Sequence, residues 1–332
     1  MIKQKIIKNK NISWLFEDLS QTNAIIHSDI DGLLTMGFLQ NYAGLKEIVG
    51  IYDLRTFHMK EEKYKTRKEF RKMVGLDLDI SYFDIRNIGH HMTCVKSNEK
   101  SLNINDLYGL QEDLVNNYYR KYPLNTVILL YSLFNIKPKT DEEIALLVYA
   151  DSVFGNYTDK YKKNVTYWLK ILNQYEILDA LENRCSTIQN IIDNQILPIT
   201  SKIKDPRASS KYSQCPLTQS VYIQAKGKCI DIYNGNPKII LDLIRRITNW
   251  NIIDLPKQLL FTRECYVNTI CLSKDKKNKD EIQAHLKKLK KFLLENKSDI
   301  VSSSMPYINS FRITTNSSDK KIVLKDNQYV YN

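Results

Sequence analysis

The first part of the chain alternates short apolar runs with segments in which apolar residues recur every three or four positions. The apolar runs at 23–29, 47–54 and 73–80 have the length of β-strands, and residues 32–40 have the apolar spacing of a helix. Residues 60–72 are largely charged and predict a helix with a solvated face. Strands that alternate with helices predict an α/β fold with a doubly wound, mainly parallel sheet.

Helical spacing dominates the middle of the chain. It occurs at 104–119, 126–133 and 141–149, and it continues with few turn signals over 157–204. These segments supply helices of the kind that cover the faces of a parallel sheet.

A break at residues 205–210, Asp-Pro-Arg-Ala-Ser-Ser, separates this part from a different pattern. Short apolar runs on either side of Lys-Gly-Lys predict a hairpin, and helices are expected at 237–250 and 280–295 with strands within 259–272 between them. Short strands mixed with helices predict an α+β domain. The predicted units are an α/β domain at 1–157, a helical connector at 158–204 and a second, smaller α+β domain at 205–332.

The formal net charge of +12 comes entirely from residues 201–332, which are the second of these domains and the four residues before it. Residues 1–200 hold 25 Lys and Arg against 25 Asp and Glu, whereas residues 201–332 hold 24 against 12. A compositional bias toward lysine would explain this excess, but a polyanion-binding surface explains it better. The candidate nucleic-acid contacts are Lys202, Lys204, Arg207, Lys211, Lys226, Lys228, Lys287, Lys288, Lys290 and Lys291.

Export and membrane signals are missing from the sequence. No apolar stretch reaches eighteen residues, and the first forty residues show no cationic segment followed by an apolar run. The six cysteines are scattered and form no CxxC pair, so we interpret them as reduced thiols. These features predict a cytoplasmic protein with no membrane partner.

The segment His27-Ser-Asp29-Ile-Asp31-Gly32 lies where the first predicted strand passes into a helix. Open α/β sheets bind their ligands at this end of the strands. Imidazole and carboxylate groups suit Mn²⁺, Mg²⁺ or Fe, and their alternate spacing lets all three side chains project from one extended turn. The alternative interpretation is that Asp31 simply caps the helix.

Three further segments carry similar side chains. Asp77 and Asp79 end the third predicted strand, and His90 and His91 form an adjacent pair shortly afterwards. Asp151 follows an apolar helix, where a carboxylate is unfavourable for the helix dipole and so needs another role. A solvated surface position is the alternative for the two histidines.

Taken in order, these four segments resemble the motifs of the DHH superfamily of metal-dependent phosphoesterases over residues 22–157. That superfamily includes RecJ-like single-strand exonucleases, oligonucleotide and cyclic-dinucleotide phosphodiesterases, and family II pyrophosphatases. The resemblance implies two Mn²⁺ or Mg²⁺ ions that bind phosphate oxygens and activate a water molecule. It implies that Asp77 bridges the ions and that His91 faces the scissile phosphate. The implied metal ligands are His27, Asp29, Asp31, Asp77, His90 and Asp151.

The sequence departs from the family in two places. Gly89 stands where the third family motif begins with Asp, so that Asp79 or Asp84 would have to supply the acid. The glycine-rich substrate segment of the family's C-terminal domain has no counterpart in 205–332. The substrate must therefore be inferred from the basic charge, which favours hydrolysis of single-stranded DNA or RNA in the manner of an exonuclease. The alternatives are a phosphodiesterase for short oligonucleotides or cyclic dinucleotides, and a non-catalytic nucleic-acid-binding protein.

Overall fold

The computed structural model of the chain describes most of its residues. The described ranges are 12–52, 56–80, 85–93, 99–159, 161–200, 225–226, 229–231, 236–256, 258–259, 261–273, 275, 278–296, 300–307, 310–316, 321–325 and 328–331. Five of the basic residues expected to contact nucleic acid lie outside these ranges: Lys202, Lys204, Arg207, Lys211 and Lys228. Lys226 lies within a described strand, but only its backbone is described.

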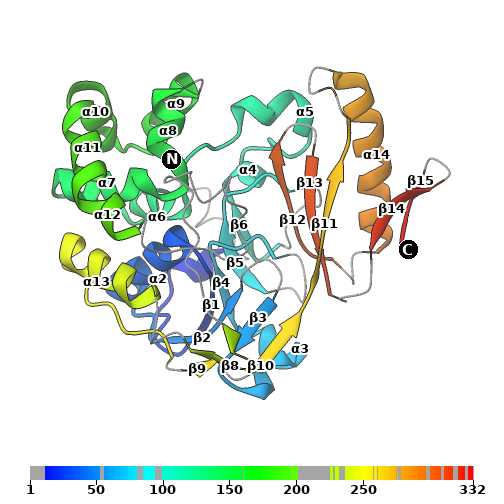
Figure 1. The fold of residues 1–332 in the computed structure, drawn as a ribbon, viewed down its shortest axis with the longest axis horizontal. Coiled ribbons are helices and arrows are strands. Elements are labelled where there is room, and N and C mark those ends of the chain that lie inside the picture. The colour runs from blue at the N-terminus through cyan, green and yellow to red at the C-terminus, as the bar shows by residue number, and fades with distance from the viewer. Residues whose placement is uncertain are drawn as a thin grey trace.

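A seven-stranded sheet forms the centre of the fold, with the strand order β10-β3-β2-β1-β4-β5-β6 (Figure 1). Its strands are β1 (Asn23–His27), β2 (Glu47–Tyr52), β3 (Thr56–Met59), β4 (Val74–Leu76), β5 (Arg86–Gly89), β6 (Ser101–Asn103) and β10 (Phe261–Glu264). The strands from β2 to β6 in this order are parallel, while β3 and β10 are antiparallel additions at one edge. The prediction of an α/β fold with a mainly parallel sheet is confirmed.

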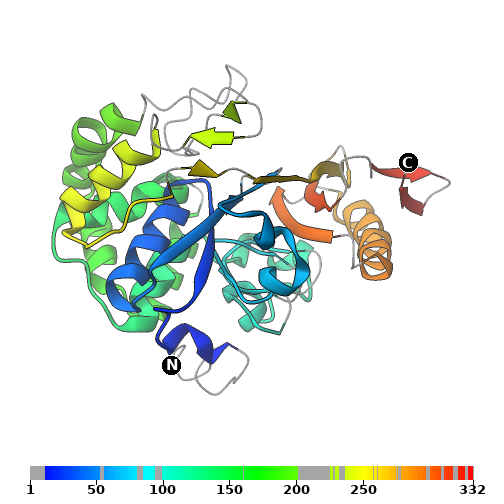
Figure 2. The same cartoon turned by 90° about the horizontal axis from the view of Figure 1, so that it is seen from below.

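The alternation of side chains along β1 divides the apolar core between the two faces of the sheet. Ala24 and Ile26 belong to the larger cluster, which also includes the buried faces of several helices. Ile25 points to the opposite face and belongs to a smaller cluster with Phe57 and Phe70. The helices of the larger cluster include α2 (Ile30–Tyr42), α6 (Thr126–Phe134), α7 (Asp141–Tyr149) and α13 (Asn236–Thr248), and Figure 2 shows the sheet between α2 and the short α3 (Arg67–Phe70).

A third apolar cluster forms in the C-terminal part of the chain. There α14 (Lys279–Glu295) packs with the antiparallel strands β11 (Tyr266–Cys271), β13 (Ser310–Thr315) and β12 (Ile300–Tyr307). A hairpin of β14 (Ile322–Lys325) and β15 (Gln328–Tyr331) adds to it.

The described part beyond residue 205 is thus distributed over all three clusters. The helix α13 packs with the N-terminal helices in the first cluster, and Cys265 and Val301 belong to the second. The helix α14 and its strands form most of the third cluster, and β10 extends the central sheet. The boundary predicted at 205 lies outside the described residues and stays a prediction.

Most of the predicted helices form, and two are interrupted. In 157–204 the helices are α8 (Val153–Thr158), α9 (Lys162–Ile171), α10 (Tyr175–Asn183), α11 (Cys185–Ile191), η6 (Ile192–Ile196) and α12 (Leu197–Thr200). The segment 60–72 divides into η2 (Glu62–Lys65) and α3, because Thr66 between them is extended. The segment 104–119 divides into α4 (Ile104–Leu107), α5 (Leu114–Asn117) and η4 (Tyr118–Arg120), and Gly109 adopts a φ of +69° between the first two. No helix in the described part of the chain is long and apolar enough to cross a bilayer.

Candidate metal centre

The candidate ligands after β1 and β4 lie at the point where the order of the parallel strands reverses. In chain order these strands are arranged 2-1-3-4-5, and the reversal falls between β1 and β4. The connections from these two strands leave in opposite directions, which is why open α/β sheets have a ligand-binding crevice there. His27 is the last residue of β1, and Asp77 directly follows β4.

The two carboxylates of the first motif, Asp29 and Asp31, bind different partners. Asp29 is the N-cap of α2, and its Oδ1 accepts a hydrogen bond from the Gly32 amide at 2.9 Å. Its Oδ2 lies 2.6 Å from His27 Nδ1, which also faces Asp77 Oδ2 at 3.4 Å. The alternative interpretation that Asp31 caps the helix is wrong, because Asp29 takes that position.

The Asp31 carboxylate instead binds backbone amides at the N-terminus of another helix. Its Oδ2 accepts a hydrogen bond from the Thr126 amide at 2.7 Å, and its Oδ1 accepts one from the Val127 amide at 3.1 Å. These N–H groups open α6 and have no partner within the helix, and the positive end of the helix dipole favours a carboxylate there. The buried carboxyl group of Asp31 is therefore fixed in position before any ligand binds.

Thr126 determines which nitrogen of His90 carries the proton. The Thr126 hydroxyl donates to Asp77 Oδ1 at 2.7 Å, so it can only accept from His90 Nδ1, which lies 3.0 Å away. Burial and the neighbouring His91 lower the pKa of His90 to about 4, which keeps its ring neutral near pH 7. His90 Nε2 therefore presents a lone pair to Asp151 Oδ2 at 3.2 Å. Two lone pairs that face each other at this distance repel each other unless a cation or a proton lies between them.

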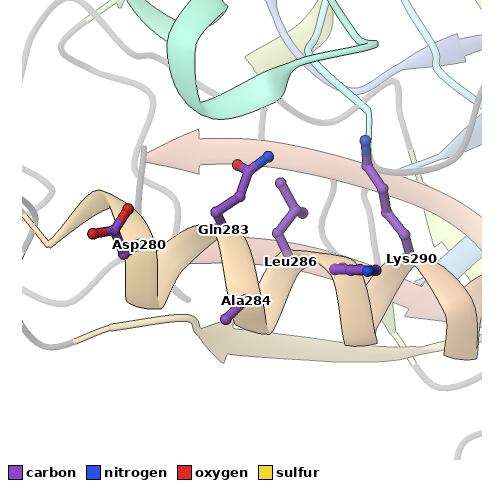
Figure 3. Close-up of a pocket in the computed structure, with 6 residues that line it drawn as sticks. Asp280, Gln283, Ala284, Leu286 and Lys290 are labelled. Atoms are coloured by element: carbon purple, nitrogen blue, oxygen red, sulfur yellow. The ribbon is translucent and has the colours of Figure 1, made fainter.

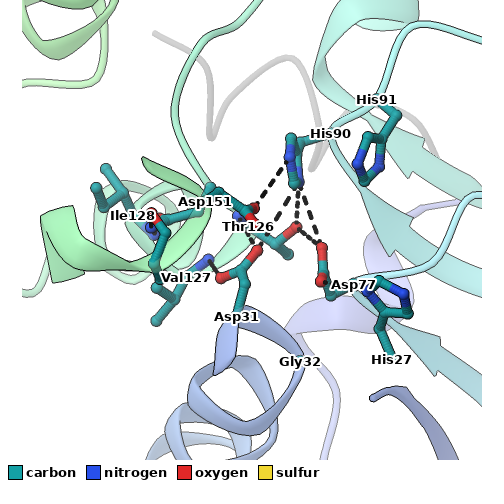
Figure 4. Close-up of polar contacts among 12 residues, drawn as sticks. His27, Asp31, Gly32, Asp77, His90, His91, Thr126, Val127, Ile128 and Asp151 are labelled. Carbon is teal, nitrogen blue, oxygen red and sulfur yellow. Dashed lines mark hydrogen bonds and ion pairs between the residues drawn. The ribbon is translucent and has the colours of Figure 1, made fainter. Parts of the chain in front are cut away.

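Two groups of ligand atoms result, each with its atoms within 4.8 Å of one another (Figure 4). Asp77 is common to both groups. Its Oδ2, and Oδ2 of Asp151, are buried and make no hydrogen bond to any described residue. The first group is His27, Asp29 and Asp77, and the second is Asp31, Asp77, His90 and Asp151; together we call these six residues the metal centre.

The acids of the metal centre carry more negative charge than the protein compensates. Burial, together with repulsion from a neighbouring carboxylate, raises the pKa of Asp77 and raises the pKa values of Asp31 and Asp151 well above the usual range. Burial also opposes ionisation of Asp29, but the His27 ring and the Gly32 amide lower its pKa to about 2. A divalent cation would remove the repulsion among these acids, so the charge distribution suits a metal site.

The backbone at the metal centre is strained at several residues. Asp77, Asp151 and Ser152 have φ values of +55°, +53° and +58°, in the left-handed region that few non-glycine residues adopt. Each such residue costs about 1–3 kcal/mol and is held by its surroundings. The buried Asn125 holds one of these turns, because its amide donates to the carbonyls of Leu147 at 2.6 Å and Ala150 at 3.2 Å.

The histidine pair is split between the interior and the surface. His90 is 8% exposed, so the alternative of a solvated position is wrong for it. The side chain of His91 is 45% exposed, and its ring stacks on that of His90 with centroids 4.2 Å apart. Its Nδ1 lies 3.0 Å from Asp79 Oδ2. Of the two acids proposed to compensate for Gly89, Asp79 therefore reaches this pair, and Asp84 lies outside the described residues.

Sequence reasoning missed the neutral residues that hold the metal centre together. These are Asn125 and Thr126 at the start of α6, and Asn103 and Asn105 around the end of β6. Asn105, for example, donates to the carbonyl of His90 at 2.7 Å. The helical spacing at 126–133 located the start of α6, and Asn125 before it is an N-cap signal, but neither indicates the contact of this helix with Asp31.

The four lysines expected to contact nucleic acid whose side chains are described lie on α14, which contributes no residue to the metal centre. Lys287 and Lys290 line a surface pocket of about 380 Å³ on this helix (Figure 3). Lys290 Nζ donates to the carbonyl of Gln111 at 3.4 Å, and Lys291 Nζ lies 4.0 Å from a Glu295 carboxylate oxygen. We call Lys287, Lys288, Lys290 and Lys291 the lysine face of α14.

Comparison with known proteins adds no relative to this picture. No protein-family model, curated protein or solved structure matches the chain. What the chain does must therefore be inferred from the residues of the metal centre and from its charge.

Proposed function

We propose that the chain is a phosphodiester hydrolase that depends on two divalent cations, Mn²⁺ or Mg²⁺. One cation would be held by His27, Asp29 and Asp77, and the other by Asp31, Asp77, His90 and Asp151. The observation that carries the proposal is the sharing of Asp77 between two adjacent groups of ligand atoms. The resemblance of the four motifs to the DHH phosphoesterases supports the same reading.

The donor set fits these metals. Carboxylate oxygens dominate it, which suits Mg²⁺ and Mn²⁺, and imidazole nitrogens extend the range toward Mn²⁺. The buried oxygens of Asp77 and Asp151 that lack hydrogen bonds, and the bare Nε2 of His90, are the atoms that would bind a cation. When bound, a pair of divalent cations neutralises phosphate oxygens and lowers the pKa of a bound water molecule.

The residues of the chain would prepare this site in two ways. Thr126 fixes the protonation of His90, and the amides of α6 fix the carboxylate of Asp31. A ligating histidine is usually oriented in this manner by a hydrogen bond at its other nitrogen. The half-exposed His91 marks the open side of the site, where a phosphate can approach its ring.

The preferred substrate is single-stranded nucleic acid. Its support is the charge excess of residues 201–332, part of which lies on the lysine face of α14, where Lys287 and Lys291 are exposed and Lys288 and Lys290 are half-buried. A polymer gains from many cationic contacts, whereas a dinucleotide needs only one or two. Short oligonucleotides or cyclic dinucleotides, and nucleic-acid binding without hydrolysis, are the alternatives that the assay below separates.

The decisive variant is Asp77→Asn. Asparagine tolerates the left-handed backbone at this position, so the fold should persist while both cations lose a shared ligand. We expect less than one Mn²⁺ per chain and a loss of about 10³-fold in hydrolysis of bis-p-nitrophenyl phosphate, which corresponds to several kcal/mol of lost charge stabilisation. Asp18→Asn, in an exposed turn, is the control with the same change of charge.

Wild-type Mn²⁺ content and turnover in Asp77→Asn would contradict the proposal. The same assay with 5′- and 3′-labelled single strands and with cyclic dinucleotides identifies the substrate class. A wild-type chain that binds single strands but hydrolyses none of these compounds would be the non-catalytic alternative.

A further inference from the structure

The carboxylate of Asp79 is buried, and its hydrogen bonds go to His91 and to one residue that also holds His91. Asp79 Oδ2 accepts from the backbone amide of His91 at 3.1 Å and faces the His91 ring Nδ1 at 3.0 Å. Asp79 Oδ1 accepts from Asn103 Nδ2 at 2.6 Å, and the same amide group donates to the carbonyl of His91 at 2.8 Å. His91 is thus fixed by its amide, its carbonyl and its ring.

Gly89 makes room for this arrangement. A Cβ atom at position 89 would lie 2.4 Å from Asp79 Oδ1 and 2.6 Å from its Cγ, which real side chains do not tolerate. The Asp79 carboxylate therefore occupies the space that a side chain at position 89 would fill. The two positions compete for one volume beside His91, and in this chain residue 79 supplies the carboxylate.

A carboxylate accepts hydrogen bonds only, so the proton of a neutral His91 ring resides on Nδ1. The ring Nε2 then has no hydrogen-bond partner among the described residues, on a side chain that is 45% exposed. We propose that Asp79 is the positioning residue of His91, holding the ring so that Nε2 faces a bound phosphate. The part of this inference that concerns a bound phosphate rests on the proposed function. The part that concerns the orientation of the His91 ring rests on the geometry alone.

The first test uses the metal-free protein and does not depend on activity. Long-range ¹⁵N spectra of the histidine rings, recorded at a pH high enough to keep the His91 ring neutral, should show His91 as a single Nδ1–H tautomer in the wild type. Asp79→Ala, and the isosteric Asp79→Asn if the alanine variant fails to fold, should shift His91 to a mixture of tautomers. Asp18→Asn is the control and should leave the His91 signals unchanged.

The second test moves the carboxylate from one position to the other. With Mn²⁺ and bis-p-nitrophenyl phosphate, Asp79→Ala should lower kcat by about 10–100-fold while Mn²⁺ content stays near the wild-type value, as for other residues that orient a site from behind. Gly89→Asp alone should also lose activity, because two carboxylates then compete for one space. The double variant Asp79→Ala/Gly89→Asp should regain about tenfold in kcat over Asp79→Ala, together with the Nδ1–H tautomer.

An unchanged His91 tautomer in both Asp79 variants would overturn the positioning role, as would a folded double variant no better than Asp79→Ala. A wild-type chain that hydrolyses no phosphodiester, but whose His91 tautomer still depends on Asp79, would overturn the proposed function and support the positioning. The two failures are therefore distinguishable.

Discussion

The metal centre and the lysine face of α14 are both charged, but they differ in the sign of the charge and in how deeply it is buried. The acids of the metal centre are largely buried, and each has particular partners, such as the two α6 amides on Asp31. The lysines lie along the surface of one helix with few contacts. Charges interact strongly away from water and are screened by salt at the surface. A single substitution should therefore matter in the first region, whereas only a combined one should matter in the second.

The largest effect is expected from Asp31→Ala, compared with Asp29→Ala. Asp31 accepts from two buried amides, and leaving them without partners should cost about 2–4 kcal/mol in the free energy of unfolding. Asp29 makes one N-cap hydrogen bond, which is worth about 1 kcal/mol. Urea denaturation of the metal-free variants measures both values. Equal losses would show that the contact between Asp31 and α6 adds nothing.

An intermediate effect is expected when the pH changes the stabilisation by Mn²⁺. The raised pKa values of Asp31, Asp77 and Asp151 mean that the folded metal-free chain holds protons that the unfolded chain releases near pH 4. This stabilisation is complete at low pH and is lost as the pH rises through the raised values. Asp29, whose pKa is about 2, stays ionised throughout and does not contribute.

Because Mn²⁺ replaces these protons, the gain in Tm on adding Mn²⁺ should increase from about pH 5 to about pH 8. At a concentration of about 100 times Kd, the gain corresponds to about 2.7 kcal/mol. Thermal unfolding at several pH values with and without Mn²⁺ measures it. Asp151→Asn should flatten the pH dependence, and a gain that is the same at every pH would contradict the assignment of these acids to a metal site.

The smallest effect per residue is expected on the lysine face. Changing Lys287, Lys288, Lys290 and Lys291 together to Gln should lower the slope of log affinity for a single strand against log salt by about 2–3, at about 0.7 per phosphate contact. Fluorescence anisotropy of a labelled oligonucleotide over a salt series measures the slope. The matching change to Arg keeps the charge and should preserve it. A slope that survives the Gln variant would assign the charge excess to composition.

The fold could be predicted where one segment contains its own signal. The helices α2, α7 and α14 and the strand β1 follow apolar patterns that are complete within the segment. The strands β3, β5 and β6 could not be predicted, because they have only three or four residues and, unlike the equally short β4, do not lie within a longer apolar run. Only the pairing of β3 with β10 joins residues far apart in the chain.

The residues of the metal centre could likewise be predicted only in part. Its six acids and imidazoles could be named because the four segments that carry them resemble the DHH motifs, and because several of them follow predicted strand and helix ends, where ligands gather. Thr126 and Asn103 could not be named, because a neutral residue shows its role only through its contacts. The Thr126 amide and Asp31 are 95 residues apart in the sequence. The sequence indicated that Asp79 or Asp84 compensates for Gly89, but only the structure shows that the Asp79 carboxylate fills the space of a side chain at position 89.

The pairing of β10 with β3 has a consequence for how the protein is made. Phe261 pairs with Met59, so the edge of the central sheet is completed only after about 200 further residues have left the ribosome. Until then β3 exposes unpaired backbone groups, which can template pairing with a second chain. Slow translation or a premature stop within that interval would leave this edge open. Protection of this edge therefore depends on β10, a strand that contributes no residue to the metal centre.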